Sequence, residues 1–360
     1  MVNICDVCTD IFAGGDAPKG RISSIRTEQY PIPIYSNGED KAGLYGYTDT
    51  ARVYAQSVTV SARGTIGYTA IRTEPFVPIV RLITLVPDQS KIDIKYLYYA
   101  VQNYEFEGSG TSIPQLTVPM LKKYNFPLPS KEEQQKVVSA LDKVNELISL
   151  RKEQLGKLDQ LVKSRFIELF GEPLSNKKGW KTMPLVKAAP IKSRRGDLAD
   201  EIWLLNLDAV EAQTGTVLFK HRVQGEEINA STVYFTTENV LYSKLRPYLN
   251  KVVMPDEDGV ATSEMIPMYP LADRLNRAYL CYWLRSDAFV KHISEKVAGA
   301  KMPRVSMDYF RSLSIELPPM ELQEQFAAFV KQTDKSKLTI QQSLDKLELL
   351  KKSLMQEYFG

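Results

Sequence analysis

Residues suited to metal or redox chemistry are few and scattered in this chain. Cys5 and Cys8 form one Cys-x-x-Cys pair, no second pair follows, and the only histidines are His221 and His292. A structural zinc site needs four thiolate or imidazole ligands at short spacings. The sequence therefore predicts no metal site in this chain.

Catalytic motifs are equally weak. The chain has no Gly-x-x-x-x-Gly-Lys-Ser/Thr loop for a nucleotide, and "FAGGDAPKG" (12–20) lacks the strand–loop–helix context of a cofactor loop. Asp88, Asp93 and Lys95 in "PDQSKIDIK" (87–95) are of the types that a nuclease uses, but they crowd into one short loop. We predict a non-catalytic chain without a cofactor of its own, and keep a nuclease built on these three residues as an alternative.

Basic residues in turn-like segments point to nucleic acid. Such segments occur at 37–47 and 61–67 in the first half and at 242–251 in the second, and a further pair lies at 108–116 and 298–306. Arg and Lys beside hydroxyl and amide side chains can hold phosphates and read base edges, although solvated loops also carry charge. The candidate DNA-binding residues are Lys41, Arg63, Thr65, Ser112, Gln115, Ser243, Lys244, Arg246, Lys251, Lys301 and Arg304.

Composition sets the broad class of the protein. With 360 residues the chain is longer than one hydrophobic core usually supports, which favours two domains. A net charge of +3 permits nucleic-acid binding without requiring it. Three cysteines, an odd number, and a first segment without the basic-then-apolar order of a secretory signal favour a cytoplasmic protein. No apolar run is long enough to predict a membrane span.

The chain contains an internal repeat. The segment 110–171 aligns with 299–360 without a gap, so that Gly110 falls on Gly299 and Gly171 on Gly360. The identities in this repeat alignment include a Gly-x-x-x-Pro landmark, a Leu-Pro landmark and the Phe-Gly pairs that end both segments. Upstream, "KYLYYAVQN" (95–103) resembles "AYLCYWLRS" (278–286) at a slightly different offset, and beyond it the halves look unrelated. We infer that the chain arose by duplication.

Each repeat contains a long helix with a coiled-coil seam. No proline interrupts 131–170, and Ser130 with Glu133 forms a Ser-x-x-Glu capping box. Alternating steps of four and three residues meet mostly apolar side chains in both copies, which is the period of a coiled coil. Lys337 and Lys351 weaken the second seam. The apolar seam residues are Val137, Leu141, Val144, Ile148, Leu155, Leu158 and Val162 in the first helix, and Phe326, Val330, Ile340, Leu344, Leu347 and Leu354 in the second.

A helix of this length needs a partner. About 40 residues span roughly 60 Å, and a solitary amphipathic helix is not stable in water. The natural partner is the other copy. A parallel pair would crowd both domains at one end, whereas an antiparallel pair would place one domain at each end of a rod, so we predict an antiparallel coiled coil.

The segments before the helices predict two α+β domains. Alternating apolar residues at 51–68 and 233–255 favour strands, whereas 93–104 and 275–297 have helical spacing. The predicted fold class is α+β, with two such domains joined by the two long helices in an internal pseudo-twofold duplication. The predicted divisions are a first α+β domain at 1–129, a central coiled-coil helix at 130–171, a second α+β domain at 172–318 and a distal coiled-coil helix at 319–360.

These features together resemble the DNA specificity subunit of type I restriction–modification systems. The segment 127–171 is similar to that family's central helical region and 316–360 to its distal one, and the shared Leu-Pro-x-x-Glu-x-Gln pattern is the most specific part. "VSARGTIGY" (60–68) and "YSKLRPYLNKV" (242–252) resemble strand–loop elements of its two target-recognition domains. The resemblance covers essentially the whole chain.

The resemblance implies a division of labour. Each target-recognition domain would read one half of a bipartite, asymmetric sequence in double-stranded DNA, and the coiled coil would set the spacer. Two methyltransferase (modification) subunits, which use S-adenosylmethionine, would dock on the chain, and motor/nuclease (restriction) subunits would join them. The alternative from another class is a coiled-coil scaffold that joins two protein-binding domains without DNA specificity.

Overall fold

The computed structural model describes residues 1–104, 115–193, 195, 201–225, 228, 231–297, 299 and 301–360. These residues form two compact units: unit 1 consists of Met1–Lys152 and Gln342–Gly360, and unit 2 of Glu153–Gln341. Each unit combines one of the two α+β halves with a stretch of both long helices, α4 (Lys131–Phe170) and α9 (Met320–Phe359). No helix in this described part is both long and apolar enough to cross a membrane.

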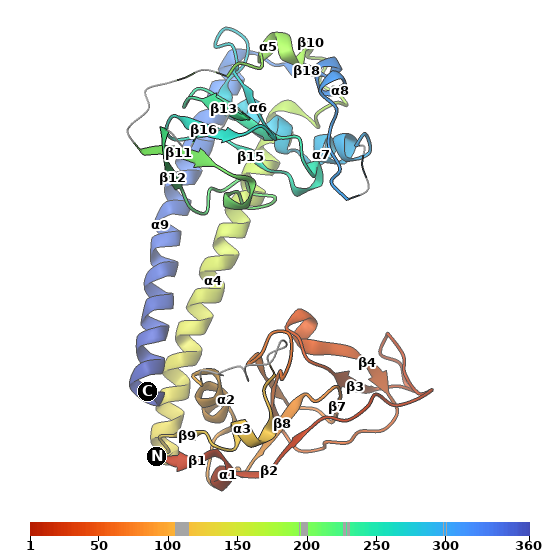
Figure 1. Ribbon diagram of the computed structural model, residues 1–360, viewed down its shortest axis with the longest axis vertical. Coiled ribbons are helices and arrows are strands. Elements are labelled where there is room, and N and C mark those ends of the chain that lie inside the picture. Colours follow the sequence, from red (N-terminus) through yellow and green to blue (C-terminus); the bar gives the residue numbers. More distant parts are fainter. Residues whose placement is uncertain are drawn as a thin grey trace. The chain divides into compact units, whose positions relative to one another are not determined.

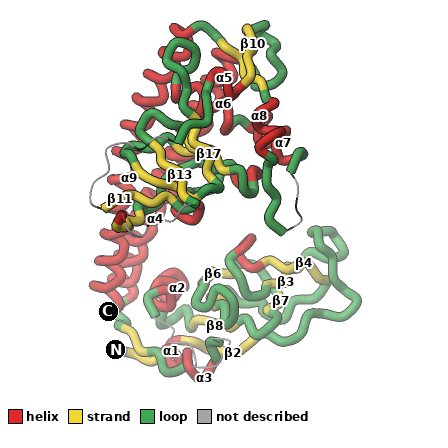
Figure 2. Tube along the Cα trace, turned by 45° about the horizontal axis from the view of Figure 1, so that its top comes forward, coloured by secondary structure: helices red, strands yellow, loops and turns green. Residues whose placement is uncertain are grey.

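Unit 1 contains three small sheets (Figure 1). Their strand orders are β2-β8-β5-β6, β4-β3-β7 and β1-β9. Helix α2 packs beside β5 and β6, and Figure 2 shows α2 near β6. The elements are β1 (Val2–Asn3), α1 (Ile4–Val7), β2 (Cys8–Ala13), β3 (Ile32–Tyr35), η1 (Asp40–Gly43), β4 (Leu44–Thr48), β5 (Ser57–Val60), β6 (Thr69–Arg72), β7 (Val77–Pro78), β8 (Ile83–Pro87), α2 (Ile94–Gln102), α3 (Val118–Leu121) and β9 (Asn125–Phe126).

Unit 2 also contains three small sheets, with the orders β12-β11-β16-β13, β15-β14-β17 and β10-β18. The predicted α+β class is therefore confirmed in both units. The elements are β10 (Lys181–Pro184), α5 (Leu185–Ala188), β11 (Glu201–Leu205), η2 (Leu207–Ala209), β12 (His221–Gln224), β13 (Thr232–Phe235), β14 (Val240–Ser243), η4 (Pro247–Leu249), β15 (Val252–Val253), β16 (Gly259–Thr262), β17 (Met265–Met268), α6 (Arg277–Arg285), α7 (Asp287–Ser294), α8 (Met307–Ser312) and β18 (Ser314–Leu317).

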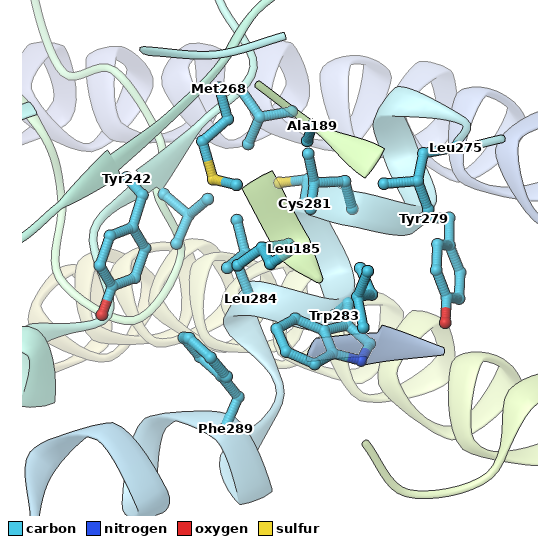
Figure 3. Packing of buried hydrophobic residues seen from close by; sticks show 14 of the residues in the cluster. Leu185, Ala189, Tyr242, Met268, Leu275, Tyr279, Cys281, Trp283, Leu284 and Phe289 are labelled. Atoms are coloured by element: carbon cyan, nitrogen blue, oxygen red, sulfur yellow. The ribbon is translucent and has the colours of Figure 1, made fainter. Parts of the chain in front are cut away.

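Apolar side chains from strands and helices build a large core in each unit. In unit 1, strand β5 is buried along its whole length, and its Val58 belongs to the same cluster as Leu97 of α2. In unit 2, Tyr242, Trp283 and Phe289 belong to one buried cluster, which Figure 3 shows from close by. Removal of such side chains from water is the main favourable contribution to folding.

Side-chain caps set the starts of the domain helices. The Asp93 carboxylate accepts the N–H groups of Lys95 and Tyr96 at the start of α2, and the Asn276 Oδ1 accepts an N–H at the start of α6. Asp and Asn are favoured at such positions because they satisfy N–H groups that have no partner within the helix. The predicted helix at 275–297 is divided at Ser286, where a new cap starts α7.

The repeat of the fold extends farther upstream than the residue identities do. The strand pair β1-β9 has its counterpart in β10-β18, and α1 follows β1 as α5 follows β10. The Ile4 N–H donates to the Tyr124 carbonyl at 3.0 Å, and in the same place the Leu185 N–H donates to the Leu313 carbonyl at 2.8 Å. Backbone bonds of this kind do not depend on side-chain identity, which explains a repeated fold without repeated residues.

One buried glutamine ties each long helix to its domain. Gln134 is 1% exposed and Gln323 0% exposed. The Asp93 N–H donates to the Gln134 Oε1, and the Asn276 N–H donates to the Gln323 Oε1, each at 2.8 Å. In both units the amide Nε2 also donates to two backbone carbonyls at 2.8–3.1 Å. The Gln of the repeated Leu-Pro-x-x-Glu-x-Gln pattern therefore fixes the start of the long helix against the start of α2 or α6.

Within each unit the stretches of α4 and α9 run antiparallel. In unit 1 the Phe359 ring at the end of α9 packs on Tyr96 at 5.0 Å, in the same cluster as Val137 near the start of α4. In unit 2 the Phe170 ring at the end of α4 packs on Tyr279 at 4.8 Å, in a cluster that includes the first turns of α9. Both chain ends lie near the start of α4 in unit 1 (Figure 1). Each Phe-Gly pair thus ends its helix in the unit where the other long helix begins.

The predicted seam positions lie on the less exposed side of both helices. All the apolar residues named for the seam are buried or half-buried. The seam residue Lys337 forms an ion pair with Asp159 of α4 at 2.5 Å, so the charge that weakens the pattern has a partner within unit 2. Polar residues at such positions fix the register of two helices at a cost in stability. The seam assignment stays a prediction, which substitution would test.

The pKa of the Asp142 carboxyl in α4 leads to a prediction about the stability of the protein in acid. Its carboxylate lies 2.5 Å from the Lys95 Nζ and accepts a hydrogen bond from the Tyr99 hydroxyl at 2.6 Å. Burial raises the pKa of this carboxyl, but the bonds from Lys95 and Tyr99 outweigh burial and hold the pKa of Asp142 below its ordinary value. A lowered folded-state pKa contributes stability above the unfolded pKa of about 3.9, and this stability is lost as the pH falls through the folded pKa.

Asp142→Asn is therefore expected to make acid unfolding less steep below about pH 4, because the variant no longer binds this proton on unfolding. Far-UV circular dichroism during an acid titration measures the slope. Glu146→Gln, which changes an exposed carboxyl on the same helix, is the control. Equal slopes for wild type and Asp142→Asn would contradict the assignment.

Candidate nucleic-acid interface

Residues 115 and 116, the described end of one predicted loop of unit 1, meet the loop that follows strand β5. The Leu116 N–H donates to the Ala62 carbonyl at 3.0 Å. Beside this bond, the Arg63 guanidinium donates to the Gln115 Oε1 from Nε at 3.2 Å and from Nη2 at 2.9 Å. Arg63 is exposed and Gln115 is half-buried. The structure thus brings together two candidate residues that are distant in the sequence.

The loop with Lys41 is joined to the same region of unit 1. The Asn37 Oδ1 accepts the Ala62 N–H at 2.7 Å, which connects the two loops. Asn37 and Thr65 both line an open hollow of about 500 Å³. Lys41 is exposed, with a left-handed φ of +48°. Lys41, Arg63 and Thr65 therefore belong to loops that one hydrogen-bond network holds together.

Unit 2 joins its corresponding loops in the same way. The Val305 N–H donates to the Lys244 carbonyl at 3.0 Å, and the Arg246 N–H donates to the Pro303 carbonyl at 2.8 Å. The repeat alignment places Leu116 on Val305, so the bond from Val305 is the counterpart of the bond from Leu116 in unit 1. Both units therefore build the same junction of two loops.

Strained backbone positions Arg246 in this junction. Arg246 and Asn250, at the two ends of η4, have left-handed φ values of +48° and +51°. Such conformations of residues other than glycine cost of order 1–3 kcal/mol and persist only where the surroundings hold them. Asn250 is 2% exposed and its amide donates to the Arg285 carbonyl at 3.0 Å. Unit 2 thus presents the exposed Arg246 side chain from a fixed backbone.

Two of the candidate DNA-binding residues of unit 2 donate hydrogen bonds to backbone carbonyls of their own unit. Ser243 is 2% exposed and its hydroxyl donates to the Leu245 carbonyl at 3.0 Å, so the prediction that Ser243 contacts DNA is wrong. The Lys251 Nζ donates to the Leu207 carbonyl at 2.6 Å, and burial lowers the pKa of Lys251. Strand β14 is buried on both faces, so Ser243 at its end is buried although it is polar.

The remaining predicted residues have varied surroundings. Lys301 and Arg304 are exposed and Lys244 is half-buried. The Arg304 guanidinium pairs with Glu264, with an Nη2–Oε1 distance of 3.0 Å. Ser112 lies outside the described residues. The roles of these residues in DNA binding stay predictions.

Sequence reasoning missed Arg81 in unit 1 and Glu264 in unit 2. The Arg81 Nη1 donates to the Gln115 Oε1 at 3.4 Å, and Glu264 binds Arg304. Arg81 lies in a turn within the apolar run "EPFVPIVRLITLVP" (74–87), which lacks the Gly, Asn or Asp that normally marks such a turn. Only the strand pairing of the folded chain reveals the turn.

The three residues of the nuclease alternative have structural partners. Asp93 caps α2, Lys95 pairs with Asp142, and the Asp88 carboxylate accepts the Ser90 hydroxyl at 2.6 Å. Across the described ranges, no group of three His, Cys, Asp or Glu side chains could hold a metal ion. The structure gives this alternative no support.

One family profile matches most of the chain. The type I restriction modification DNA specificity domain matches residues 1–160 and residues 178–349. The two matched stretches follow each other along the chain, in agreement with the duplication of the fold.

Individual proteins are similar over different extents. A putative type I specificity subunit of Mycoplasma pneumoniae is 35% identical over 137 residues, which cover 38% of this chain and 40% of that protein, so the match spans about two fifths of that relative. The MjaIX specificity subunit of Methanocaldococcus jannaschii is 24% identical, with coverage of 89% of this chain and 80% of the relative. The crystal structure of a type I restriction-modification S subunit from M. genitalium has a TM-score of 0.58 at 16% identity and covers 100% of this chain and 95% of that one, which is a likeness of fold.

Proposed function

Since this chain belongs to the family of type I restriction–modification DNA specificity subunits, we propose that units 1 and 2 each read one half of a bipartite, asymmetric DNA site. The observation that carries the proposal is the junction of two loops, which both units build around an equivalent backbone hydrogen bond. Around it, unit 1 places Arg63 and unit 2 places Arg246 and Arg304. A repeated backbone with different loop side chains suits one duplex that is read at two places with different sequences.

The exposed basic residues would divide the work by their chemistry. A planar guanidinium offers paired donors that fit a base edge, so Arg63 and Arg246 are the proposed base readers. An ammonium is a flexible point charge, which suits phosphates, so Lys41 and Lys301 are the proposed phosphate contacts.

The long helices would supply the geometry of the assembly. Because α4 and α9 each run from one unit into the other, they would set the number of base pairs between the two half-sites. Two methyltransferase subunits would dock on this chain and restriction subunits would join them for cleavage. S-adenosylmethionine and the chemistry of base methylation would belong to the methyltransferase subunit.

Duplex binding separates this proposal from a protein scaffold without DNA specificity. The chain in complex with its methyltransferase subunit is expected to bind duplex DNA with a log K that falls linearly as log salt rises, because bound cationic groups release counterions from phosphates. Fluorescence anisotropy at several salt concentrations measures the slope. Binding that is absent, or that does not respond to salt, would favour the scaffold.

The two units should respond separately to substitution. Arg63→Ala is expected to change the sequence preference in one half of the methylated site, and Arg246→Gly in the other half only, each by about tenfold. Glycine is chosen at 246 because it accepts the left-handed backbone. Arg222→Ala, which removes a guanidinium paired with Glu257, is the control. A change in both halves from either single substitution would contradict the assignment of one half to each unit.

A further inference from the structure

The same two positions contact each other in both units, but with different residues. In unit 1 the Arg81 Nη1 donates to the Gln115 Oε1 at 3.4 Å. In unit 2 the Arg304 Nη2 lies 3.0 Å from the Glu264 Oε1. The repeat alignment places Gln115 on Arg304. Gln115 and Arg304 are therefore equivalent by sequence. Their partners, Arg81 and Glu264, are equivalent by strand register.

Strand register makes Arg81 the counterpart of Glu264. The Ala62 carbonyl in unit 1 and the Lys244 carbonyl in unit 2 accept the two equivalent loop bonds. The residue two positions before each carbonyl is a matching position, which lies in β5 in unit 1 and in β14 in unit 2. The residue at each matching position pairs with an isoleucine of the neighbouring strand. Arg81 in unit 1 and Glu264 in unit 2 each lie two residues before that isoleucine. The strand pairs are Val60 with Ile83 in unit 1 and Tyr242 with Ile266 in unit 2. Arg81 and Glu264 thus occupy equivalent places just before β8 and β17.

Unit 1 holds Arg81 in a strained turn. Val80 and Arg81 have left-handed φ values of +53° and +64°, and the Leu82 N–H donates to the Ile79 carbonyl at 3.0 Å. Turns with two left-handed central residues normally use Gly, Asn or Asp, and a β-branched valine there is an outlier. The Asn37 amide fastens the turn by donating to the Val80 carbonyl at 2.6 Å. Strain of this kind clusters at functional sites.

The contact partners determine what the turn can offer a ligand. Arg63, Arg81 and Gln115 form what we name the unit 1 donor cluster. Arginine has no acceptor, so the Gln115 oxygen must face the two guanidinium groups, and the orientation of the amide is fixed. The oxygen is engaged, and among the described residues none accepts a hydrogen bond from the Gln115 Nε2, which can therefore donate to a ligand. The cluster therefore offers N–H donors alone.

We propose that Arg81 and Glu264 are specificity-determining residues of their units, and that the unit 1 donor cluster selects guanine at one position of its half-site. The inference rests on the proposed function, because it requires that unit 1 faces DNA. Guanine presents two acceptors, N7 and O6, in the major groove, whereas adenine and cytosine each present an amino donor there. In unit 2 the Glu264 carboxylate adds acceptors beside Arg304, so the same place has a different polarity.

The change of charge between the units favours a base over a phosphate as the ligand. The sugar–phosphate backbone is the same in both half-sites, so a phosphate-binding position would keep a cation in both units. Instead the Arg81 contact in unit 1 keeps its positive charge, whereas in unit 2 the Glu264 carboxylate neutralises Arg304, the cation of the same contact. A place whose charge differs between the units suits a base contact, because the base sequence also differs between the half-sites.

The test uses the full chain expressed with its methyltransferase subunit in a bacterial strain without other DNA methylation. Methylated bases are mapped genome-wide for wild type, Arg81→Gly, Arg81→Lys and Glu264→Gln. Glycine removes the side chain at a left-handed position, so the melting temperature should not fall. Guanine preference at one position of one half-site should drop about tenfold in Arg81→Gly. Arg81→Lys keeps the charge without the planar fork and should lose the same preference, whereas Glu264→Gln should alter only the other half.

Arg26→Ala, which removes an exposed guanidinium of unit 1 that pairs with Glu74, is the matched control and should leave the motif unchanged. A uniform fall in methylation with an unaltered motif in Arg81→Gly, or full guanine preference in Arg81→Lys, would identify a phosphate contact and overturn the inference. A wild-type motif whose halves both lack a guanine that responds to Arg81 would also overturn it. A wild type without any bipartite motif would instead overturn the proposed function.

Discussion

Phe166→Ala in unit 2 is expected to lower the free energy of unfolding by about 3–5 kcal/mol. Phe166 is 2% exposed, and its ring lies 5.0 Å from that of Phe170, 5.5 Å from that of Tyr279 and 5.3 Å from that of Phe326. Truncation would leave a cavity where α4, α6 and α9 meet and would remove these ring contacts. The loss therefore affects the joint between both long helices and the domain.

Tryptophan fluorescence during urea unfolding reports this loss selectively, because every tryptophan of the chain lies in unit 2. The residues are Trp180, Trp203 and Trp283. Ile167→Ala, next along α4 and 43% exposed, is the control and should cost much less. Met355→Ala, the counterpart of Phe166 in unit 1, should move the tryptophan transition less than Phe166→Ala. Equal effects of Phe166→Ala and Ile167→Ala would contradict the packing.

Under the proposed docking of two methyltransferase subunits, Leu161→Glu and Leu350→Glu are each expected to release one copy, and the double variant both copies. The repeat alignment places Leu161 on Leu350, and they are 50% and 44% exposed. An exposed leucine that the duplication repeats suits an interface used twice by one partner. A glutamate buried unpaired in that interface would cost about 2 kcal/mol or more.

Light scattering of the purified complexes gives the number of partner copies for each variant. Leu338→Glu is the control, because Leu338 is 61% exposed but its counterpart at 149 is a serine, so the leucine is not repeated. Two copies of the partner on the double variant would place the docking surface elsewhere.

The sequence predicted the parts of the fold that depend on regular spacing. The coiled-coil period located both long helices, and the shared Leu-Pro-x-x-Glu-x-Gln pattern contains Gln134 and Gln323, which are buried in the structure. Both glutamines bind backbone groups, so their chemistry is the same whatever side chains surround them. Positions of this kind keep their residue type after duplication, and sequence comparison finds them.

Other parts could not be read from the sequence, for identifiable physical reasons. The repeat of β1-β9 in β10-β18 rests on backbone hydrogen bonds that many side chains permit, so no residue pattern marks it. The turn at Val80 uses a residue type that disfavours its conformation, which hides it from turn signals. The hydroxyl of Ser243 in a turn-like basic segment predicts a DNA contact, whereas the sheet around Ser243 buries both faces of its strand.

The most direct test of this account is the methylome of a host in which the chain and its methyltransferase subunit are the sole modification system. We predict a single bipartite motif whose two halves differ in sequence and are separated by a spacer of fixed length. Absence of methylation, or a continuous or palindromic motif, would contradict the central claim that each unit reads one half of the site.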